Sequence, residues 1–293
     1  MALNTLVLIL GLFIPQGNGD DKKNDSMEMR LEKGQSLMET VFDRFHINYE
    51  MSRLHKVGYY KESVSDSAST YYLAEGIVDI YIPCNLSKSE NASISPIKAR
   101  KTVFKQVDQE SLLLGNASDM ARSSIWRPNS FLDEKNRYDY NFSLSAEDSF
   151  KGSEVAVIEF EPRKEHGTTM GRIYVDKKSF AIVKIEYQPI VIKSKVWQNI
   201  TWTEEFTFRN GAYELTNVHF HGEGADNHYQ YDATLIMNQL EVVSKFPENE
   251  EFIQDEVPLF ERAKEELDES FWEGFSFLRQ SLNAEQFLTA QNH

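Results

Sequence analysis

The sequence predicts a mainly β protein of the α+β class, with a single large curved antiparallel sheet or open half-barrel of about 9–10 strands. Two observations predict this fold. Apolar residues recur with a period of two through most of residues 53–238, and short turns rich in Gly, Asn, Asp or Lys join the segments. No long helical segment separates successive strands, as a parallel α/β sheet would require. Helical patterns are confined to the two ends of the chain, so we expect N- and C-terminal helices.

The first element, residues 1–19, is predicted to be a signal peptide. It contains no Asp, Glu, Lys or Arg, and its apolar run, Thr5 to Ile14, is well short of the roughly 20 residues that span a bilayer. Gly17 and Gly19 occupy the −3 and −1 positions of a signal-peptidase site, so we expect cleavage after Gly19. A buried N-terminal helix is the alternative. No later run reaches membrane-spanning length, so we expect no transmembrane span in the mature chain. Because of the signal peptide, we expect the mature chain in the periplasm or associated with the outer envelope.

Residues 20–30 are polar and predict a linker, and residues 31–293 predict a single domain with a helical C-terminal segment. The domain opens with a helical stripe that includes Met38, Val41, Phe42 and Phe45. Residues 109–137 have a mixed pattern and are expected to be irregular or helical. Strands are expected at residues 53–64, 69–83, 97–107, 137–145, 153–162, 195–210, 212–222 and 228–238, and a hairpin at 167–187.

The hairpin GTTMGRIYVDKKSFAIVKIEY, residues 167–187, has the clearest alternation in the chain. Its apolar face would be the working surface of a curved sheet with helices on one side. A dry core packed against those helices is the alternative. The residues predicted to line a ligand cavity on this face are Ile173, Val175, Val183, Ile185, Trp202, Phe206, Phe220, Tyr231 and Leu235.

No catalytic or nucleotide-binding motif of the common kinds is present, so the sequence predicts a non-enzymatic protein without a cofactor. His219, His221 and His228 are weak candidates for metal ligands. The first two alternate with Val218 and Phe220, which places them on the polar face of a strand, so we expect no metal there. Neighbouring carboxylates such as Glu204 and Glu205 face opposite sides of a strand and cannot form an acid/base pair.

The chain is acidic, with a formal net charge of −15, which argues against a nucleic-acid partner. Residues Glu248 to Glu273 hold eleven acids against two basic residues. This segment is either a solvated helical face or a surface that docks a basic envelope protein. Cys84 is the only cysteine, so no internal disulfide can form. N-glycosylation triplets begin at Asn24, Asn85, Asn91, Asn116, Asn141 and Asn199, and would be used only in a eukaryotic secretory pathway.

Six segments in order resemble the C-terminal region of Bacteroidota proteins named for a carboxypeptidase-like regulatory domain: AEGIVDIYIP, KARKTVF, FLDEKNRYDYNFSL, GSEVAVIEFEP, GRIYVDKKSFAIVKIEY and DESFWEGF. The resemblance runs from Leu31 to Phe275. The regulatory domain that normally precedes this region is missing, so the resemblance implies no peptidase activity and no catalytic residues. It would also make the tripeptides starting at Asp25 and Asp66 candidates for the O-glycosylation signal of these bacteria.

More loosely, the hairpin is similar to hairpins in the LolA and LolB class of lipoprotein carriers. That similarity implies an unclosed antiparallel half-barrel that holds acyl chains under a helical lid. The leading hypothesis is therefore an exported envelope protein that binds a lipid, a lipoprotein or another hydrophobic group. The second hypothesis is an envelope interaction module that uses its acidic C-terminal segment, and the third is a metal-dependent hydrolase built around His219 and His221.

Overall fold

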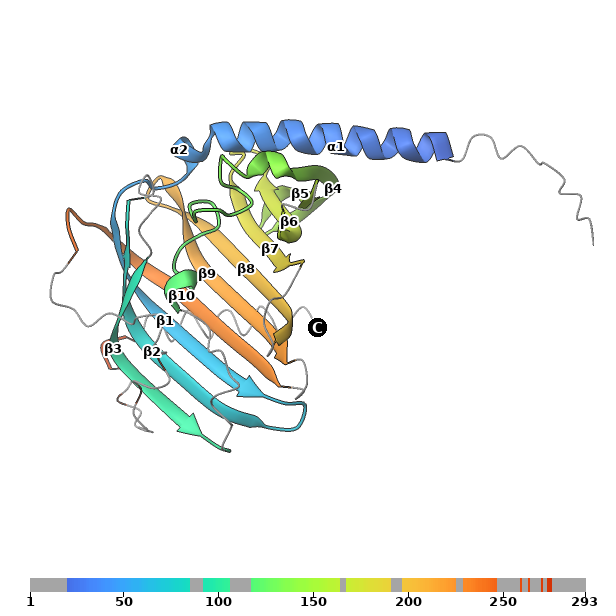
Figure 1. Cartoon of the computed structure of the whole chain (residues 1–293). Coiled ribbons are helices and arrows are strands. Elements are labelled where there is room, and N and C mark those ends of the chain that lie inside the picture. The colour runs from blue at the N-terminus through green and yellow to red at the C-terminus, as the bar shows by residue number, and fades with distance from the viewer. Residues whose placement is uncertain are drawn as a thin grey trace, which may run out of the picture.

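A computed structural model of the chain describes residues 20–84, 92–105, 117–163, 167–190, 197–224, 229–246, 259, 263, 270 and 273–275. Figure 1 shows one curved sheet with a long helix beside one of its ends. The helices are α1 (Asp20–Asp43), α2 (Phe45–Asn48), α3 (Ala117–Met120) and the 3-10 helix η2 (Arg137–Asp139). The strands are β1 (Leu54–Ser65), β2 (Thr70–Ile82), β3 (Ser93–Val103), β4 (Tyr140–Phe150), β5 (Ser153–Pro162), β6 (Thr169–Asp176), β7 (Ile182–Pro189), β8 (Trp197–Arg209), β9 (Ala212–Gly224) and β10 (Gln230–Val242).

The ten described strands form a single antiparallel sheet in the order β3-β2-β1-β10-β9-β8-β7-β6-β5-β4. Strands β1 to β3 pair in sequence order, and so do strands β4 to β10. The pairing of β1 with β10 joins these two groups into one sheet. The two edge strands, β3 and β4, do not pair with each other, so the sheet is open rather than a closed barrel. The predicted fold class, a large curved antiparallel sheet, is therefore confirmed.

The strand bounds follow the alternation of the sequence closely. β5 spans the predicted residues, and β1, β2, β8, β9 and β10 differ from their predicted ranges by a few residues at their ends. β3 lies four residues earlier than predicted, because its pairing with β2 begins at Ser93 and ends at Val103. The hairpin is present as β6 and β7. A bulge shifts its register, so Val175 pairs with Ile182, while Ile173 pairs with Ile185 as the alternation predicts.

The two faces of the sheet differ in what covers them. We call inner the face that carries Phe142, Phe160, Tyr187 and their partners across the sheet, because it forms the main hydrophobic core. This core also contains Met38 and Val41 of α1, Phe45 of α2 and apolar residues of the segment 117–139. The helical stripe predicted from Met38, Val41 and Phe45 therefore faces the sheet. Burial of this apolar surface is the dominant favourable contribution to folding.

Helix α1 lies directly on the edge strand β4. A Cβ added at Gly34 would meet the main-chain nitrogen of Leu144 at 2.6 Å, so only glycine permits this close approach. The Nε atom of Arg30 donates to the carbonyl oxygen of Leu144 (2.8 Å), which satisfies one edge acceptor. The helix begins at Asp20, so residues 20–30, expected to form a linker, are helical. In Figure 1 the first turns of α1 extend beyond the sheet.

Part of the C-terminal segment returns to the β2–β3 end of the sheet. The side chain of Leu259 is buried against Gly76 of β2, and the amide of Ala263 donates to the carbonyl of Leu259 (2.9 Å), as in a helical turn. The Nζ atom of Lys98 donates to the carbonyl oxygen of Ser270 (3.0 Å). The rest of the predicted acidic helical segment, the predicted signal peptide 1–19 and His228 lie outside the described residues.

Candidate functional site

The residues predicted to line a ligand cavity are mostly packed in the core. Seven of the nine are buried, and the side chains of Trp202 and Phe220 are partly buried against the same core. Phe206 also lines a small cavity of about 40 Å³, and Trp202 lines the large hollow described below. The buried residues of the prediction are Ile173, Val175, Val183, Ile185, Phe206, Tyr231 and Leu235.

The segment 117–139 covers part of the inner face that was predicted to bind a ligand. The ring of Phe131 stacks on Phe160 (4.2 Å between centroids) and also contacts Tyr187 (5.5 Å). Gly171 lies between these two residues in the register, so no side chain of β6 separates them. The ring of Trp126 meets Phe45 of α2 at 5.9 Å. Aromatic side chains from an irregular segment thus complete the core at this position.

A buried carboxylate, Glu204 of β8, anchors this segment to the sheet. Its oxygens accept hydrogen bonds from the Ser124 amide (2.9 Å), the Ser124 hydroxyl, the Ser123 hydroxyl (3.1 Å) and the Tyr187 hydroxyl (3.0 Å). The next residue, Glu205, lies on the opposite face and pairs with Lys151 (2.8 Å). The prediction that these two carboxylates face opposite sides is confirmed. The sequence analysis missed the anchoring role of Glu204, although its position between Trp202 and Phe206 on an apolar face indicated a buried charge.

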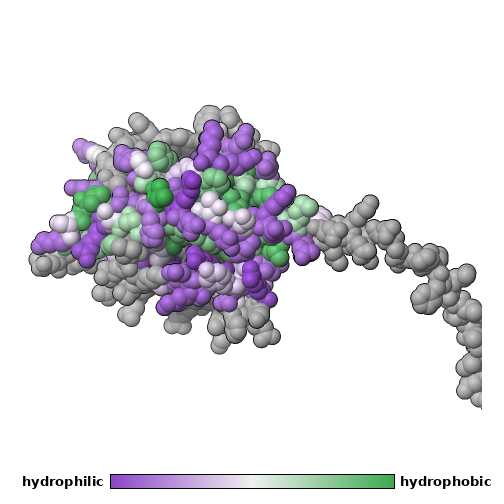
Figure 2. Space-filling model, turned by 90° about the horizontal axis from the view of Figure 1, so that it is seen from above, coloured by the Kyte–Doolittle hydropathy of each residue, from purple (hydrophilic) through white to green (hydrophobic). Residues whose placement is uncertain are grey.

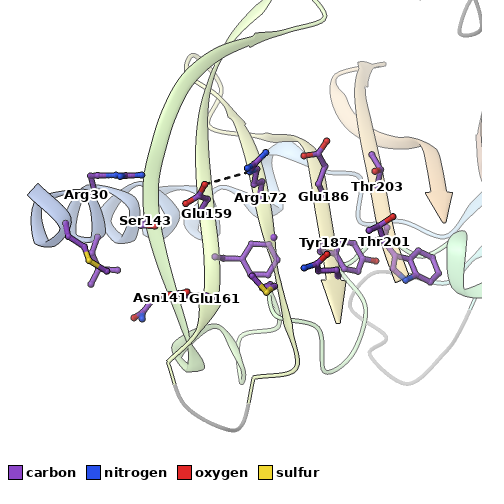
Figure 3. A pocket seen from close by; sticks show the side chains of 17 residues that line it. Arg30, Asn141, Ser143, Glu159, Glu161, Arg172, Glu186, Tyr187, Thr201 and Thr203 are labelled. Atoms are coloured by element: carbon purple, nitrogen blue, oxygen red, sulfur yellow. Dashed lines mark ion pairs between the residues drawn. The ribbon is translucent and has the colours of Figure 1, made fainter. Parts of the chain in front are cut away.

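A hollow of about 760 Å³ lies between the N-terminal half of α1 and strands β4 to β8, and we call it the α1 hollow. Figure 3 shows its side chains, with Arg30 on the helix and the other labelled residues on successive strands. Its lining residues are Met27, Arg30, Leu31, Asn141, Ser143, Glu159, Phe160, Glu161, Met170, Gly171, Arg172, Glu186, Tyr187, Gln188, Thr201, Trp202 and Thr203.

The polar side of the α1 hollow is a row across five strands. Ser143, Glu159, Arg172, Glu186 and Thr203 are successive partners in the register from β4 to β8 (Figure 3). Arg172 and Glu159 form an ion pair of 3.8 Å, and both side chains are about half exposed. The row therefore places charges of both signs at the opening of the hollow.

Glu186 is the most strongly held member of this row. It pairs with Lys184 (2.6 Å) and accepts a hydrogen bond from the hydroxyl of Tyr174 (2.9 Å). Burial alone would raise the pKa of Glu186, but the Lys184 ammonium and the Tyr174 hydroxyl outweigh it and lower that pKa. Burial, with the adjacent carboxylate, raises the pKa of Tyr174 to about 12. Glu186 is thus ionised at neutral pH and contributes a fixed negative charge.

The apolar side of the α1 hollow comes from Met27, Leu31, Phe160, Met170 and Trp202. Strands β7 and β8 are paired from Lys184 to Tyr187 against Trp202 to Glu205, and their described residues do not pair beyond this stretch. Phe160 and Trp202 belong to the inner face and Met170 lies on the opposite one, so both faces of the sheet contribute to the hollow. A mixed lining with apolar contacts and a few polar groups suits a small amphiphilic ligand.

His219 and His221 lie on the polar outer face of β9, as their alternation with Val218 and Phe220 predicts. His221 Nδ1 lies 2.8 Å from Asp232, and His219 Nδ1 lies 3.2 Å from the hydroxyl of Thr234. Burial lowers the pKa of His219 in spite of the nearby Asp232 carboxylate. Within the described part of the chain, no group of three or more His, Cys, Asp or Glu residues is arranged to hold a metal ion.

The side of the molecule seen in Figure 2 is mainly hydrophilic, with scattered apolar residues rather than one continuous apolar patch. Among the residues that the structure describes, no helix combines the length and the apolar character needed to cross a bilayer.

Comparisons with known proteins identify no family for this chain. No family model and no curated protein matches it. Among solved structures, a DUF1329 family protein from Desulfovibrio piger is 12% identical with a TM-score of 0.37, over 74% of this chain and 95% of that protein. A LolA superfamily protein from Nitrosomonas europaea is 14% identical with a TM-score of 0.33, over 73% of this chain and 94% of that protein. Because the TM-scores with these structures are low, the fold is assigned from the sheet topology of this chain alone.

Proposed function

We propose that this chain is a non-catalytic binding protein of the cell envelope that holds the apolar part of a lipid or of a lipid-modified protein in the α1 hollow. The observation that carries the proposal is the hollow itself. Its volume of about 760 Å³ falls within the roughly 300–1,000 Å³ typical of small-molecule sites. Its lining combines methionine, leucine and aromatic side chains with a row of charges at the opening.

The arrangement of the lining supports an amphiphilic ligand. Met27, Leu31 and Met170 would contact the apolar part, and Met170 keeps 39% of its surface exposed without a ligand. Methionine is unbranched and polarizable, so it adapts to apolar ligands of different shape. Arg172 and Arg30 can meet an anionic headgroup, and Glu161 and Glu186 can meet a cationic one.

Export after cleavage at Gly19 belongs to this proposal, as does a location in the periplasm or outer envelope. Both are supported by the uncharged apolar run at residues 5–14. The kinship with Bacteroidota proteins that carry a carboxypeptidase-like regulatory domain remains a prediction, since no family model matches the chain.

Binding of a fluorescent acyl-chain probe to the purified protein tests the proposed function. Met170→Glu places a charge in the apolar part of the hollow, and desolvation of that charge should weaken probe binding at least about tenfold. Met29→Glu is the matched control, because Met29 is an exposed methionine of α1 that does not line the hollow. Its probe affinity should equal that of the wild type.

Absence of probe binding by the wild type would refute the proposal. Equal losses in Met170→Glu and Met29→Glu would assign the binding to exposed apolar surface instead of the hollow. Native mass spectrometry of the protein isolated from its own host should in addition detect a copurifying lipid.

A further inference from the structure

We propose a second binding site in the cavity between the C-terminal end of α1, α2 and residues 125–137, which takes a small monocarboxylate with an aromatic or aliphatic body. This cavity has a volume of about 420 Å³, and we call it the Arg137 cavity. It shares no lining residue with the α1 hollow, so the inference is independent of the proposed function.

Arg137 supplies the positive charge of the site. Its guanidinium lies over the ring of Phe42 at 4.8 Å and over the ring of Tyr138 at 5.1 Å. These two contacts hold the planar group in a fixed orientation, which lowers the entropy lost on binding a carboxylate. A guanidinium fixed in this way is suited to bind a carboxylate through two parallel hydrogen bonds.

Most donors of Arg137 have no protein acceptor. A guanidinium has five N–H donors, and within the described chain only Nη2 donates, to the hydroxyl of Tyr138 at 3.3 Å. Nε is buried and has no acceptor there. No carboxylate lies within ion-pair distance of this guanidinium among the described residues. A carboxylate in the cavity would supply the missing acceptors and the missing countercharge.

The rest of the Arg137 cavity is suited to an apolar body. Phe45 and Trp126 form one wall as an edge-to-face pair with centroids 5.9 Å apart, and Ile125 and Leu132 are buried beside them. An aromatic or aliphatic group placed against this wall would lose water-exposed apolar surface, which favours binding by roughly 25 cal/mol per Å².

The remaining charges limit the ligand to one negative charge. Arg127, the second arginine of the lining, donates through Nη2 to the carbonyl oxygens of Asp119 (2.6 Å) and Arg122 (2.9 Å). Its Nη1 reaches the hydroxyl of Tyr187 at 3.5 Å. Arg127 is therefore committed to protein acceptors. Asp43 and Glu134 are exposed at the rim, and the buried carboxylate of Asp133 accepts hydrogen bonds from the amides of Asn129 (3.1 Å) and Lys135 (3.2 Å). These three carboxylates would repel a dianion such as a phosphate monoester.

Calorimetric titration of the full chain with phenylacetate, phenyl phosphate and phenethylamine tests the site. These probes share a phenyl ring and differ in charge. Phenylacetate should bind most tightly. Arg137→Gln should weaken it by about ten- to a hundredfold, since hydrogen bonds to a charged group contribute that much. Arg209→Gln is the matched control, because Arg209 is an exposed arginine of β8 that lines neither the Arg137 cavity nor the α1 hollow, and it should leave phenylacetate binding unchanged.

A second variant tests the charge argument with the opposite sign. Glu134→Gln removes an exposed rim charge, so it should preserve the fold and strengthen phenyl phosphate binding severalfold. The proposal is overturned if phenylacetate does not bind at millimolar concentration, if Arg137→Gln binds it as tightly as the wild type, or if phenethylamine binds more tightly than phenylacetate.

Discussion

Replacement of Glu204 by glutamine should release residues 117–139 from the inner face of the sheet. Glu204 is 1% exposed and accepts hydrogen bonds from two serines of that segment and from Tyr187 of β7. Glutamine has nearly the same shape, but it replaces one acceptor oxygen by an NH₂ group that faces donors. The substitution therefore leaves buried N–H and O–H groups without acceptors, and changes little else.

The expected cost can be derived from these contacts. A hydrogen bond to a charged group contributes about 1.5–3 kcal/mol, and an unsatisfied buried donor costs about 1–3 kcal/mol. The contacts share one carboxylate and are not additive, and glutamine retains one acceptor oxygen. We therefore expect Glu204→Gln to lower the free energy of unfolding by about 2–4 kcal/mol.

Urea unfolding measures this loss, and hydrogen exchange of peptides from residues 117–139 locates it. Glu205→Gln is the control, because Glu205 follows Glu204 in the strand but pairs with Lys151 on the outer face. The side chain of Lys151 is about half exposed, so that pair should contribute less than about 1 kcal/mol. A free energy of unfolding for Glu204→Gln within about 0.5 kcal/mol of the wild type, with unchanged exchange in 117–139, would refute the anchoring role.

Three further substitutions test other parts of the fold. Burial lowers the pKa of Lys56 to about 8, despite the Glu214 carboxylate 3.6 Å away. Between pH 8 and the ordinary lysine pKa, this side chain is therefore protonated more often in the unfolded state than in the folded state. Stability should then rise from pH 8 upward by at most about 1.4 kcal/mol per unit, and urea unfolding of Lys56→Met should lack this rise. Gly34→Val should detach α1 from β4, seen as faster hydrogen exchange in residues 26–43 with the sheet still protected. The double substitution His219→Ala and His221→Ala should change the free energy of unfolding by no more than about 0.5 kcal/mol. Stoichiometric zinc bound by the wild type and lost in this variant would contradict the assignment of both histidines to a polar face.

The sequence predicted the sheet well because alternation with a period of two is a local signal. β5 has the predicted bounds, and β2 differs from its predicted range by one residue at each end. The bulge that pairs Val175 with Ile182 was not predictable, since it depends on how two twisted strands meet. The helical state of residues 20–30 was also missed, because this stretch has few apolar residues to form a stripe.

The candidate site was harder to predict than the fold, for a physical reason. The α1 hollow depends on Gly34 lying against the backbone of β4, about 110 residues away in the sequence, and on side chains from five strands and both faces of the sheet. The pattern of one strand reveals neither feature. The binding role proposed for Arg137 could not be predicted either, because it depends on the contact between its guanidinium and the ring of Phe42 of α1. Sequence periodicity shows which side chains share a face, but a cavity depends on what covers that face.

The same strands supply both a packed core and an open hollow, because adjacent rows of side chains lie on opposite faces. One row contains Phe160, Tyr187 and Trp202, and Phe131 covers its first two members. The next row contains Glu159 and Arg172, which remain about half exposed beside α1. The residues predicted to form a ligand wall therefore lie mostly in the core, whereas the α1 hollow is lined mainly by residues of the other face. Substitutions of Phe160 or Tyr187 should therefore change stability first, whereas substitutions of the exposed lining residues Met170 and Arg172 should change binding first. This difference makes the proposed function testable without unfolding the protein.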